Sequence, residues 1–315
     1  MVSRMCWKLA VWLTALFLLT PASGLLADEL PIIDAHSQAD PQIDFDEILE
    51  LMDEARVSHT VLALRGRRKP GELIAFAARH ADRITPAVRS KGGPFNKNEL
   101  GKFKKFLKKR LKMSGFGAMA EVLMFHAMKL NRVGTFLAPE VVAHPDDPKV
   151  RFVLAKAIKR NWPFIAHIEF ASIGGDRGLF MTKFEDMLRQ NPGHPFVLIH
   201  MGQLKAKDVS RLIAAHGNIH FITAHTNPVT VSLSEEPWVD QFDGDSLAAE
   251  WKELYLRHPD RFILGFDNVW ARHWKELYVD QVALWRKALG ELPDTVAHAV
   301  AHGNAERLWH LPPAK

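Results

Sequence analysis

Histidine, acidic and amide side chains recur in this sequence where short apolar segments end. Imidazole and carboxylate groups are ligands for zinc, manganese and iron, and the same groups exchange protons in acid–base catalysis. Their distribution along the chain therefore predicts either a metal site or an acid–base site. The residues in these positions are His36, Gln38, Glu121, His167, His200, His225 and Asp267.

A single histidine at the end of a strand is more often a hydrogen-bonded structural group than a ligand. Several such groups at one end of a sheet would be costly to bury unpaired, and one divalent cation satisfies them together. Cys6 is the only cysteine, so the ligands must be histidine and oxygen. We predict one divalent ion, with zinc as first choice and manganese or iron as alternatives. The rival interpretation is a metal-poor protein that binds an anionic ligand without chemistry.

Basic residues end two of the apolar segments in place of histidine. Arg65 follows the second segment, and Arg89 and Lys91 follow the third. Guanidinium and ammonium groups hold carboxylates by charge-assisted hydrogen bonds, so these three residues predict contacts to an anionic part of a substrate. We assign His225 to the same substrate-binding group.

The elements that position these residues are eight apolar segments separated by amphipathic stretches. Short, continuously apolar segments are typical of parallel strands buried on both faces. Eight alternations of strand and helix favour a (β/α)₈ TIM barrel, an α/β fold, with an open doubly wound sheet as the alternative. In a barrel the carboxyl ends of all strands meet at one mouth, which would bring the polar residues together. The segments are residues 31–36, 57–64, 84–89, 115–122, 164–168, 196–200, 219–225 and 262–267.

Helix signals lie between these segments. Residues 45–56 carry apolar side chains at helical spacing behind Asp44, a candidate N-cap. Asp147 followed by Pro148 predicts the start of another helix. Residues 123–162 and 226–261 form the longest connections between strands.

The sequence resembles the amidohydrolase superfamily, in the amidohydrolase-related branch that includes aminocarboxymuconate-semialdehyde decarboxylase-like proteins. The similar motifs are Ile33-Asp34-Ala35-His36, Ile165-Ala166-His167, Leu198-Ile199-His200-Met201-Gly202, the segment 258–267 (HPDRFILGFD) and the segment 303–308 (GNAERL). Each motif is weak alone, but their order over the whole mature chain is specific for the family. The resemblance does not specify a substrate.

The resemblance implies which residues hold the metal. His36, His167 and Asp267 match ligand positions, His200 is a ligand or orients substrate, and Glu121 takes the fourth-strand position. Gln38 stands where the family has a second histidine, so either Gln38 coordinates through its oxygen, Glu121 compensates, or metal affinity is lost. His126, Glu169, His298 and His302 are expected to be structural or outer groups.

The implied activity is hydrolysis of an amide, ester or lactone by a metal-activated water, on a small carboxylate-bearing substrate. Asp267 would accept the water proton and pass it to the leaving group, while His200 would polarise the substrate carbonyl. A decarboxylase or lyase on the same site is the alternative. Aromatic residues in the late connections would either cover the mouth or form core or homodimer contacts; they are Trp238, Phe242, Trp270 and Trp274.

The N-terminus predicts export. Arg4 and Lys8 precede an apolar run of residues 9–19, and Ala22-Ser23-Gly24 offers small residues for cleavage. The run is too short for a membrane span, so residues 1–24 are expected to be a signal peptide of a periplasmic or secreted protein. No linker-like segment interrupts residues 25–315, which predicts a single domain.

The positive charge of the chain is concentrated in one segment. Residues 102–112 (KFKKFLKKRLK) hold seven basic residues and no acidic one, while the whole chain has a net charge of +5. Apolar residues at helical spacing predict an outer amphipathic helix with a solvated lysine face. Weak contact with an anionic surface is the alternative function of this helix. Nucleic acid is not an expected partner, because no binding motif accompanies the charge.

Overall fold

The structure is a computed structural model that describes residues 29–130 and 135–314. The predicted signal peptide, residues 1–24, lies outside the described residues. Within the described part of the chain, no helix is both long and apolar enough to cross a membrane.

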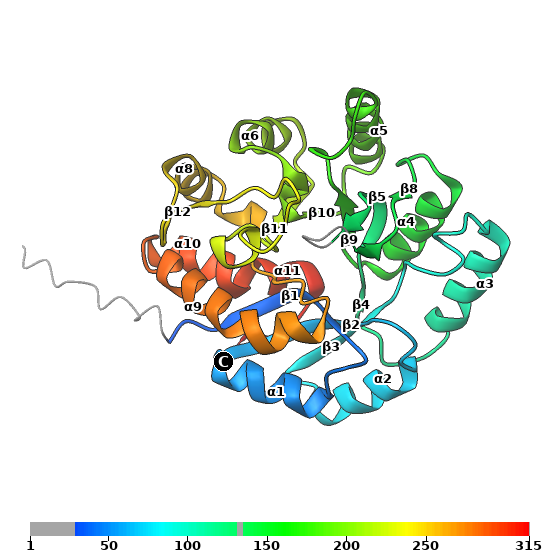
Figure 1. The fold of residues 1–315 in the computed structure, drawn as a ribbon, viewed down its shortest axis with the longest axis horizontal. Helices are drawn as coiled ribbons and strands as arrows, with labels where there is room; N and C mark the ends of the chain where they lie inside the picture. The colour runs from blue at the N-terminus through cyan, green and yellow to red at the C-terminus, as the bar shows by residue number, and fades with distance from the viewer. Residues whose placement is uncertain (1–28, 131–134, 315) are drawn as a thin grey trace, which may run out of the picture.

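Eight parallel strand positions form a closed barrel (Figure 1), which confirms the predicted fold class. One sheet has the order β1-β2-β3-β4, and the other runs β14-β11-β10-β9-β5 with the antiparallel β8 at its edge. The bounds are β1 (Ile32–Ala39), β2 (Val57–Leu64), β3 (Ile84–Val88), β4 (Ala118–Met119), β5 (Val122–His126), β8 (Val141–Val142), β9 (Phe164–Ile168), β10 (Phe196–Ile199), β11 (Ile219–Ile222) and β14 (Phe262–Ile263).

Backbone hydrogen bonds beyond β14 close the ring against β1. The Ala35 amide donates to the Leu264 carbonyl at 3.0 Å, and the Asp267 amide donates to the His36 carbonyl at 2.8 Å. The Gln38 amide donates to the Asn268 carbonyl at 2.9 Å. These bonds hold the segment that carries Asp267 against β1 and so complete the last strand position.

The fourth strand position differs from the expected segment 115–122. It consists of two pieces, β4 and β5, with Ala120 and Glu121 between them. The Ala120 amide still donates to the Val88 carbonyl at 2.9 Å, so the interruption is local. Glu121 therefore lies at a break inside this strand position rather than at its end.

Helices surround the barrel (Figure 1) and bury their apolar faces against it. Asp147 caps α4 as predicted, because its side chain accepts a hydrogen bond from the Lys149 amide at 2.7 Å. Asp44 occupies the predicted N-cap position of α1 but makes no capping hydrogen bond with its side chain. The outer helices are α1 (Phe45–Glu54), α2 (Pro70–Arg79), α3 (Leu100–Leu111), α4 (Pro148–Arg160), α5 (Arg177–Gln190), α6 (Ala206–Ala215), α8 (Ala249–Arg257) and α9 (Tyr278–Leu289).

Shorter elements complete the two ends of the barrel. Ala305, Leu308 and Trp309 of α11 (Asn304–Trp309) pack against inward-facing residues near the strand starts, such as Ile33 and Ile165. The connections on the opposite side contain β6 (Lys129–Leu130), β7 (Phe136–Ala138), α7 (Pro228–Val231), β12 (Phe242–Asp243) and β13 (Ser246–Leu247). The remaining short helices are η1 (His200–Gln203), η2 (Pro259–Arg261), η3 (His273–Leu277), α10 (Asp294–His298) and η4 (Ala299–Gly303).

Candidate active site

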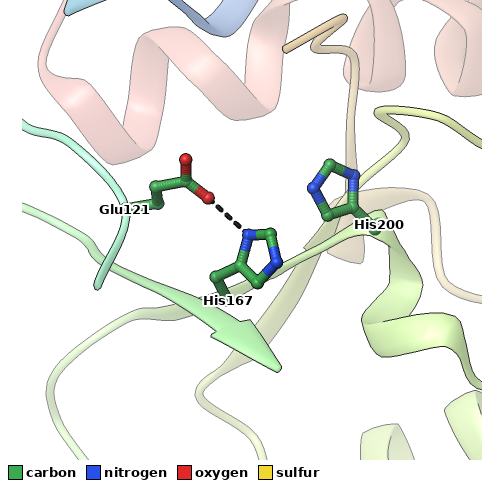
Figure 2. Close-up of side chains that lie close together, drawn as sticks. All are labelled: Glu121, His167 and His200. Atoms are coloured by element: carbon green, nitrogen blue, oxygen red, sulfur yellow. Dashed lines mark hydrogen bonds and ion pairs between the residues drawn. The ribbon is translucent and has the colours of Figure 1, made fainter. Parts of the chain in front are cut away.

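The barrel brings the predicted ligand residues into one buried cluster at the carboxyl ends of the strands. His36 and Gln38 lie on β1, Glu121 lies between β4 and β5, and His167 lies on β9. His200 begins η1 directly after β10, and Asp267 follows β14. Their exposed fractions range from 0 to 4%. Figure 2 shows Glu121, His167 and His200 from three strand positions with their polar groups close together.

His167 is held by a carboxylate on each ring nitrogen. Its Nδ1 lies 2.6 Å from Glu121 Oε2 (Figure 2), and its Nε2 lies 2.9 Å from Glu169 Oε1. Burial lowers the pKa of His167, but Glu121 and Glu169 outweigh it and raise the pKa to about 9. An ionised carboxylate only accepts hydrogen bonds, so the ring carries a proton on both nitrogens at neutral pH. Coordination of a metal by His167 requires loss of one of these protons.

Glu121 is the most highly connected group of the cluster. Its Oε1 contacts Lys91 Nζ and lies 3.6 Å from His36 Nε2. Burial raises the pKa of Glu121, but Lys91 and His167 outweigh it and hold the pKa well below its usual range. The carboxylate is therefore ionised in the buried cluster.

His36 has the properties of a ligand without a partner. It is fully buried, and neither of its ring nitrogens forms a hydrogen bond among the described residues. Its Nε2 lies 3.6 Å from Glu121 Oε1 and 3.5 Å from Asp267 Oδ1. Buried polar atoms without partners are rare in proteins, so a group that satisfies His36 fits this position. Two carboxylates beside an imidazole suit a divalent cation.

Four overlapping groups of three residues meet the distance requirement for a metal site. In each group one ligand atom per residue lies within 4.8 Å of the others. His36, Glu121 and Asp267 form the fully buried group that includes the unpartnered imidazole. The other groups are Glu121, His167 and His200; His200, His225 and Asp267; and His126, His167 and Glu169.

The hydrogen bonds of His200 determine its tautomer. Its Nδ1 lies 3.0 Å from the Ala224 carbonyl oxygen, which can only accept, so Nδ1 carries the proton. Burial lowers the pKa of His200 well below its usual value, with His225 and His167 adding to the effect. The ring is therefore neutral, and its Nε2 presents a lone pair 3.5 Å from Asp267 Oδ2. This arrangement suits a ligand or a proton acceptor rather than a donor to a substrate carbonyl.

Asp267 and Gln38 complete the cluster. Burial and Glu121 raise the pKa of Asp267, but the neighbouring His36 and His200 outweigh them and lower it. The Gln38 side-chain nitrogen donates to Asp267 Oδ1 at 2.9 Å and to Glu121 Oε1 at 3.2 Å. Gln38 thus directs its side-chain nitrogen toward the carboxylates. The side-chain oxygen, the atom through which Gln38 would coordinate the metal, does not make these contacts.

The four predicted substrate-binding residues differ in position. The Arg65 guanidinium lies 3.3 Å above the Trp270 ring and 3.9 Å from Asp40 Oδ2, with 23% of the side chain exposed. Arg89 is tied to backbone, donating to the Gly66 carbonyl at 2.7 Å and to the Lys91 carbonyl at 3.1 Å.

Lys91 and His225 lie against the ligand cluster itself. The Lys91 ammonium contacts Glu121, and the His225 ring stacks on His200 with centroids 4.8 Å apart. Arg65 is therefore the member of the predicted group best placed to meet an anion from solvent.

Glu169, an expected outer group, and Lys129, which lies outside the predicted set, have the largest roles beyond the predicted ligands. Glu169 lies two residues after His167, and the period of a strand places both side chains on one face, which is a readable signal. Lys129 Nζ lies 2.7 Å from Glu169 Oε2 and 2.7 Å from Glu236 Oε2. Lys129 lies in the long connection after the fourth strand position, where no sequence pattern indicates that it contacts the site.

The remaining predicted outer groups separate into two locations. The His126 ring lies 5.3 Å from the His167 ring, beside the cluster. His302 Nε2 lies 3.3 Å from His298 Nδ1, and its Nδ1 lies 2.9 Å from Glu306 Oε1, in the C-terminal helical segment.

The aromatic residues of the late connections include both mouth and core groups. Trp238 packs on His200 with ring centroids 4.9 Å apart, and Trp270 is 37% exposed beneath Arg65. Phe242 packs on Trp285 at 5.1 Å, in the core. Trp274 is buried and donates through Nε1 to the Gln38 carbonyl at 2.9 Å.

The sequence matches the amidohydrolase family over residues 18–311, so the chain belongs to this family. This result confirms the family predicted from the motifs. No protein of curated function matches the chain.

Solved structures share the fold at low sequence identity. An uncharacterised TIM-barrel protein from Bordetella bronchiseptica has a TM-score of 0.54 and 16% identity, covering 90% of this chain and 99% of that one. An amidohydrolase from Burkholderia multivorans with bound zinc has a TM-score of 0.54 and 16% identity, covering 90% and 100%. A 5-carboxyvanillate decarboxylase from Novosphingobium aromaticivorans with bound manganese has a TM-score of 0.50 and 12% identity, covering 90% and 98%.

Proposed function

We propose that this amidohydrolase-family protein is a metal-dependent hydrolase of a small, carboxylate-bearing amide, ester or lactone. The observation that carries the proposal is the buried cluster with a fully buried, unpartnered His36 between Glu121 and Asp267. Such a cluster is costly in a structural role, because buried ionised groups require partners. A bound divalent cation accounts for that cost.

His36, Glu121 and Asp267 would hold the cation, with His200 Nε2 available as a neutral fourth ligand and His167 after loss of a proton. Zinc is our first choice, with manganese or iron as alternatives; two solved structures of the fold carry zinc and manganese. When bound, the ion polarises a substrate carbonyl and lowers the pKa of a coordinated water. Histidine and carboxylate ligands suit all three metals.

The side chains of the cluster divide the remaining roles. The lowered pKa of Asp267 leaves its carboxylate ionised at neutral pH, so it can accept a proton from the attacking water and return it to the leaving group. His200 would contribute its Nε2 lone pair to the cation and no proton to the substrate, since its only proton is donated to the Ala224 carbonyl. The doubly protonated His167 and the Lys91 ammonium supply positive charge beside Glu121.

Arg65 would bind the substrate carboxylate. Stacking on Trp270 fixes the plane of its guanidinium, while its partial exposure leaves donors available to a ligand. The Trp238 ring against His200 adds an apolar wall to the same mouth.

The first test measures the metal in the purified protein by mass spectrometry. We expect about one divalent ion per chain, with much less in His36→Ala and Asp267→Ala. His216→Ala is the matched control, because His216 follows the outer helix α6 and pairs with Glu185 of α5 at 3.0 Å. Absence of metal after purification with excess zinc or manganese would contradict the proposal and favour a non-catalytic anion-binding barrel.

The second test separates hydrolysis from decarboxylation. The competing lyase function is favoured by the solved structure of a decarboxylase with the same fold and by the basic Arg65 at the mouth. Carboxylate-bearing amides, esters and lactones are assayed for acid release, and aromatic carboxylates are assayed for carbon dioxide release. Metal-dependent carbon dioxide release without hydrolysis would replace the hydrolase by the lyase.

We also propose that the protein is exported to the periplasm or outside the cell, on the basis of residues 1–24. N-terminal sequencing of the protein from periplasmic and cytoplasmic fractions tests this. A mature N-terminus near residue 25 in the periplasm is expected, and an intact N-terminus confined to the cytoplasm would contradict export.

A further inference from the structure

Two neighbouring outer helices, α3 and α4, carry basic residues and no acidic residue. The sequence of α3 is LGKFKKFLKKRL and that of α4 is PKVRFVLAKAIKR. The two helices pack side by side, and Arg160 of α4 donates to the Leu111 carbonyl at the end of α3 at 3.0 Å. We call their solvent side the α3–α4 face; its cations are Lys102, Lys104, Lys105, Lys108, Lys109, Arg110, Lys112, Arg151, Lys156, Lys159 and Arg160.

The cations point away from the barrel because the apolar residues point into it. Phe103 and Leu107 of α3 are fully buried, and so are Val150 and Val153 of α4. At about 100° per residue, Lys105, Lys108 and Lys112 fall on the opposite side of α3. Both helices thus present positive charge to solvent on the same flank of the molecule (Figure 1).

Phe152 lies at the seam of the two helices and joins their charges into one surface. Lys104 and Lys108 of α3 lie 5.6 and 6.0 Å from its ring centre, and Lys156 of α4 lies at 5.1 Å. Arg110 lies 3.5 Å from the Phe106 ring, and Arg160 lies 5.4 Å from the Trp162 ring. The face therefore combines cations with half-buried aromatic rings.

The residues that the structure describes leave most of the charge of this face unneutralised. Among the described residues, Glu99 is the single carboxylate in an ion pair with a cation of the face, through Lys102 at 2.8 Å. By contrast, α1 carries five carboxylates and no basic residue (FDEILELMDE), and α2 separates it from α3 (Figure 1). Charge of opposite sign is thus segregated to different flanks.

We propose that the α3–α4 face docks the protein on membrane surfaces that contain anionic phospholipids. Lysine side chains cover apolar surface with their stems and extend their charge to lipid phosphates. Lysine outnumbers arginine on the face, which favours diffuse attraction to a charged surface over bidentate recognition of single phosphates. A nucleic acid fits less well, because the rings are covered by cations of the protein and are not free to stack on bases.

The test measures binding of the purified protein to sedimented vesicles. We expect binding to vesicles containing phosphatidylserine, none to phosphatidylcholine alone, and loss of binding at high salt. Each cation at an anionic bilayer contributes roughly fivefold to partitioning. The variant Lys105→Glu/Lys108→Glu/Lys109→Glu/Lys159→Glu should therefore bind at least about 100-fold more weakly.

The matched control reverses four exposed basic residues on other elements, for which the described residues supply no ion pair: Arg67→Glu/Lys69→Glu/Lys205→Glu/Lys207→Glu. It changes the net charge equally, so it should retain most of the binding if the α3–α4 face is the contact. Circular dichroism confirms that both variants are folded. Equal loss in both variants, no binding by the unmodified protein, or tighter binding to a duplex oligonucleotide than to the anionic vesicles would overturn the proposal.

Discussion

Replacing Lys129 by methionine tests whether the cluster depends on a single ammonium for its charge balance. Lys129 Nζ lies 2.7 Å from Glu169 Oε2 and 2.7 Å from Glu236 Oε2. Glu169 is buried, with 1% of its side chain exposed, whereas Glu236 is 17% exposed. Methionine keeps most of the side-chain length and removes the charge. Glu169 would then be a buried carboxylate whose Oε2 has lost the Lys129 ammonium.

We expect Lys129→Met to lower the free energy of unfolding by about 3 kcal/mol. Breaking a buried ion pair costs roughly 3–5 kcal/mol, because one charge remains uncompensated. The lower end applies here, since Glu169 still accepts hydrogen bonds from the Ala127 amide at 2.8 Å and faces His167 Nε2 at 2.9 Å. Urea denaturation followed by circular dichroism measures the difference.

Two further variants test whether the loss of stability comes from the buried charge of Glu169. Glu236→Gln removes the more exposed partner and should cost about 1 kcal/mol or less. The double variant Lys129→Met/Glu169→Gln should recover most of the lost stability, because no buried charge is left without a partner and Glu236 is partly exposed to solvent. Equal costs for Lys129→Met and Glu236→Gln, or a double variant no more stable than Lys129→Met, would refute the argument from burial.

Three other predictions concern turnover, substrate binding and acid stability. Asp267→Asn should lower turnover at least about 100-fold, measured by acid release or carbon dioxide release, because an amide cannot accept the proton of the attacking water. Unchanged turnover would exclude Asp267 as the general base. Arg65→Ala should raise KM for a carboxylate-bearing substrate but not for its neutral amide analogue, and equal effects on both would remove Arg65 from the anion site. Burial, with Arg261 and Arg307, lowers the pKa of His220 to about 4. Between pH 6.5 and 4 the unfolded chain binds the proton and the folded chain does not, so stability falls as pH falls. His220→Gln should reduce that loss by up to about 3 kcal/mol at pH 4, measured by urea denaturation at both pH values.

The barrel and the principal site residues could be predicted because both depend on local patterns. Apolar segments such as residues 164–168 and 196–200 coincide with β9 and β10, apart from one terminal residue. The polar residues at their ends converge because parallel strands share one mouth. The placement of His36, His167 and Asp267 in one cluster is therefore predictable from their positions at the strand ends.

The details that decide the chemistry depend on contacts between distant segments. The tautomer of His200 is fixed by the Ala224 carbonyl, and the charge of His167 is fixed by two carboxylates from different parts of the chain. The side-chain nitrogen of Gln38 faces two carboxylates because both present acceptor oxygens to it. The period of a strand indicates only the pairing of His167 with Glu169; no period or motif in the sequence encodes the others.

The closure of the barrel also determines when during synthesis the cluster can be completed. The backbone bonds that complete the ring join His36 and Gln38 to the segment around Asp267, near opposite ends of the chain. During synthesis His36, Gln38, Glu121, His167 and His200 all emerge before Asp267, so a growing chain carries an incomplete cluster. Binding of the proposed metal by the complete cluster would therefore follow the synthesis of the last strand position. Chains truncated before residue 267 would lack the site even if their first strands were folded.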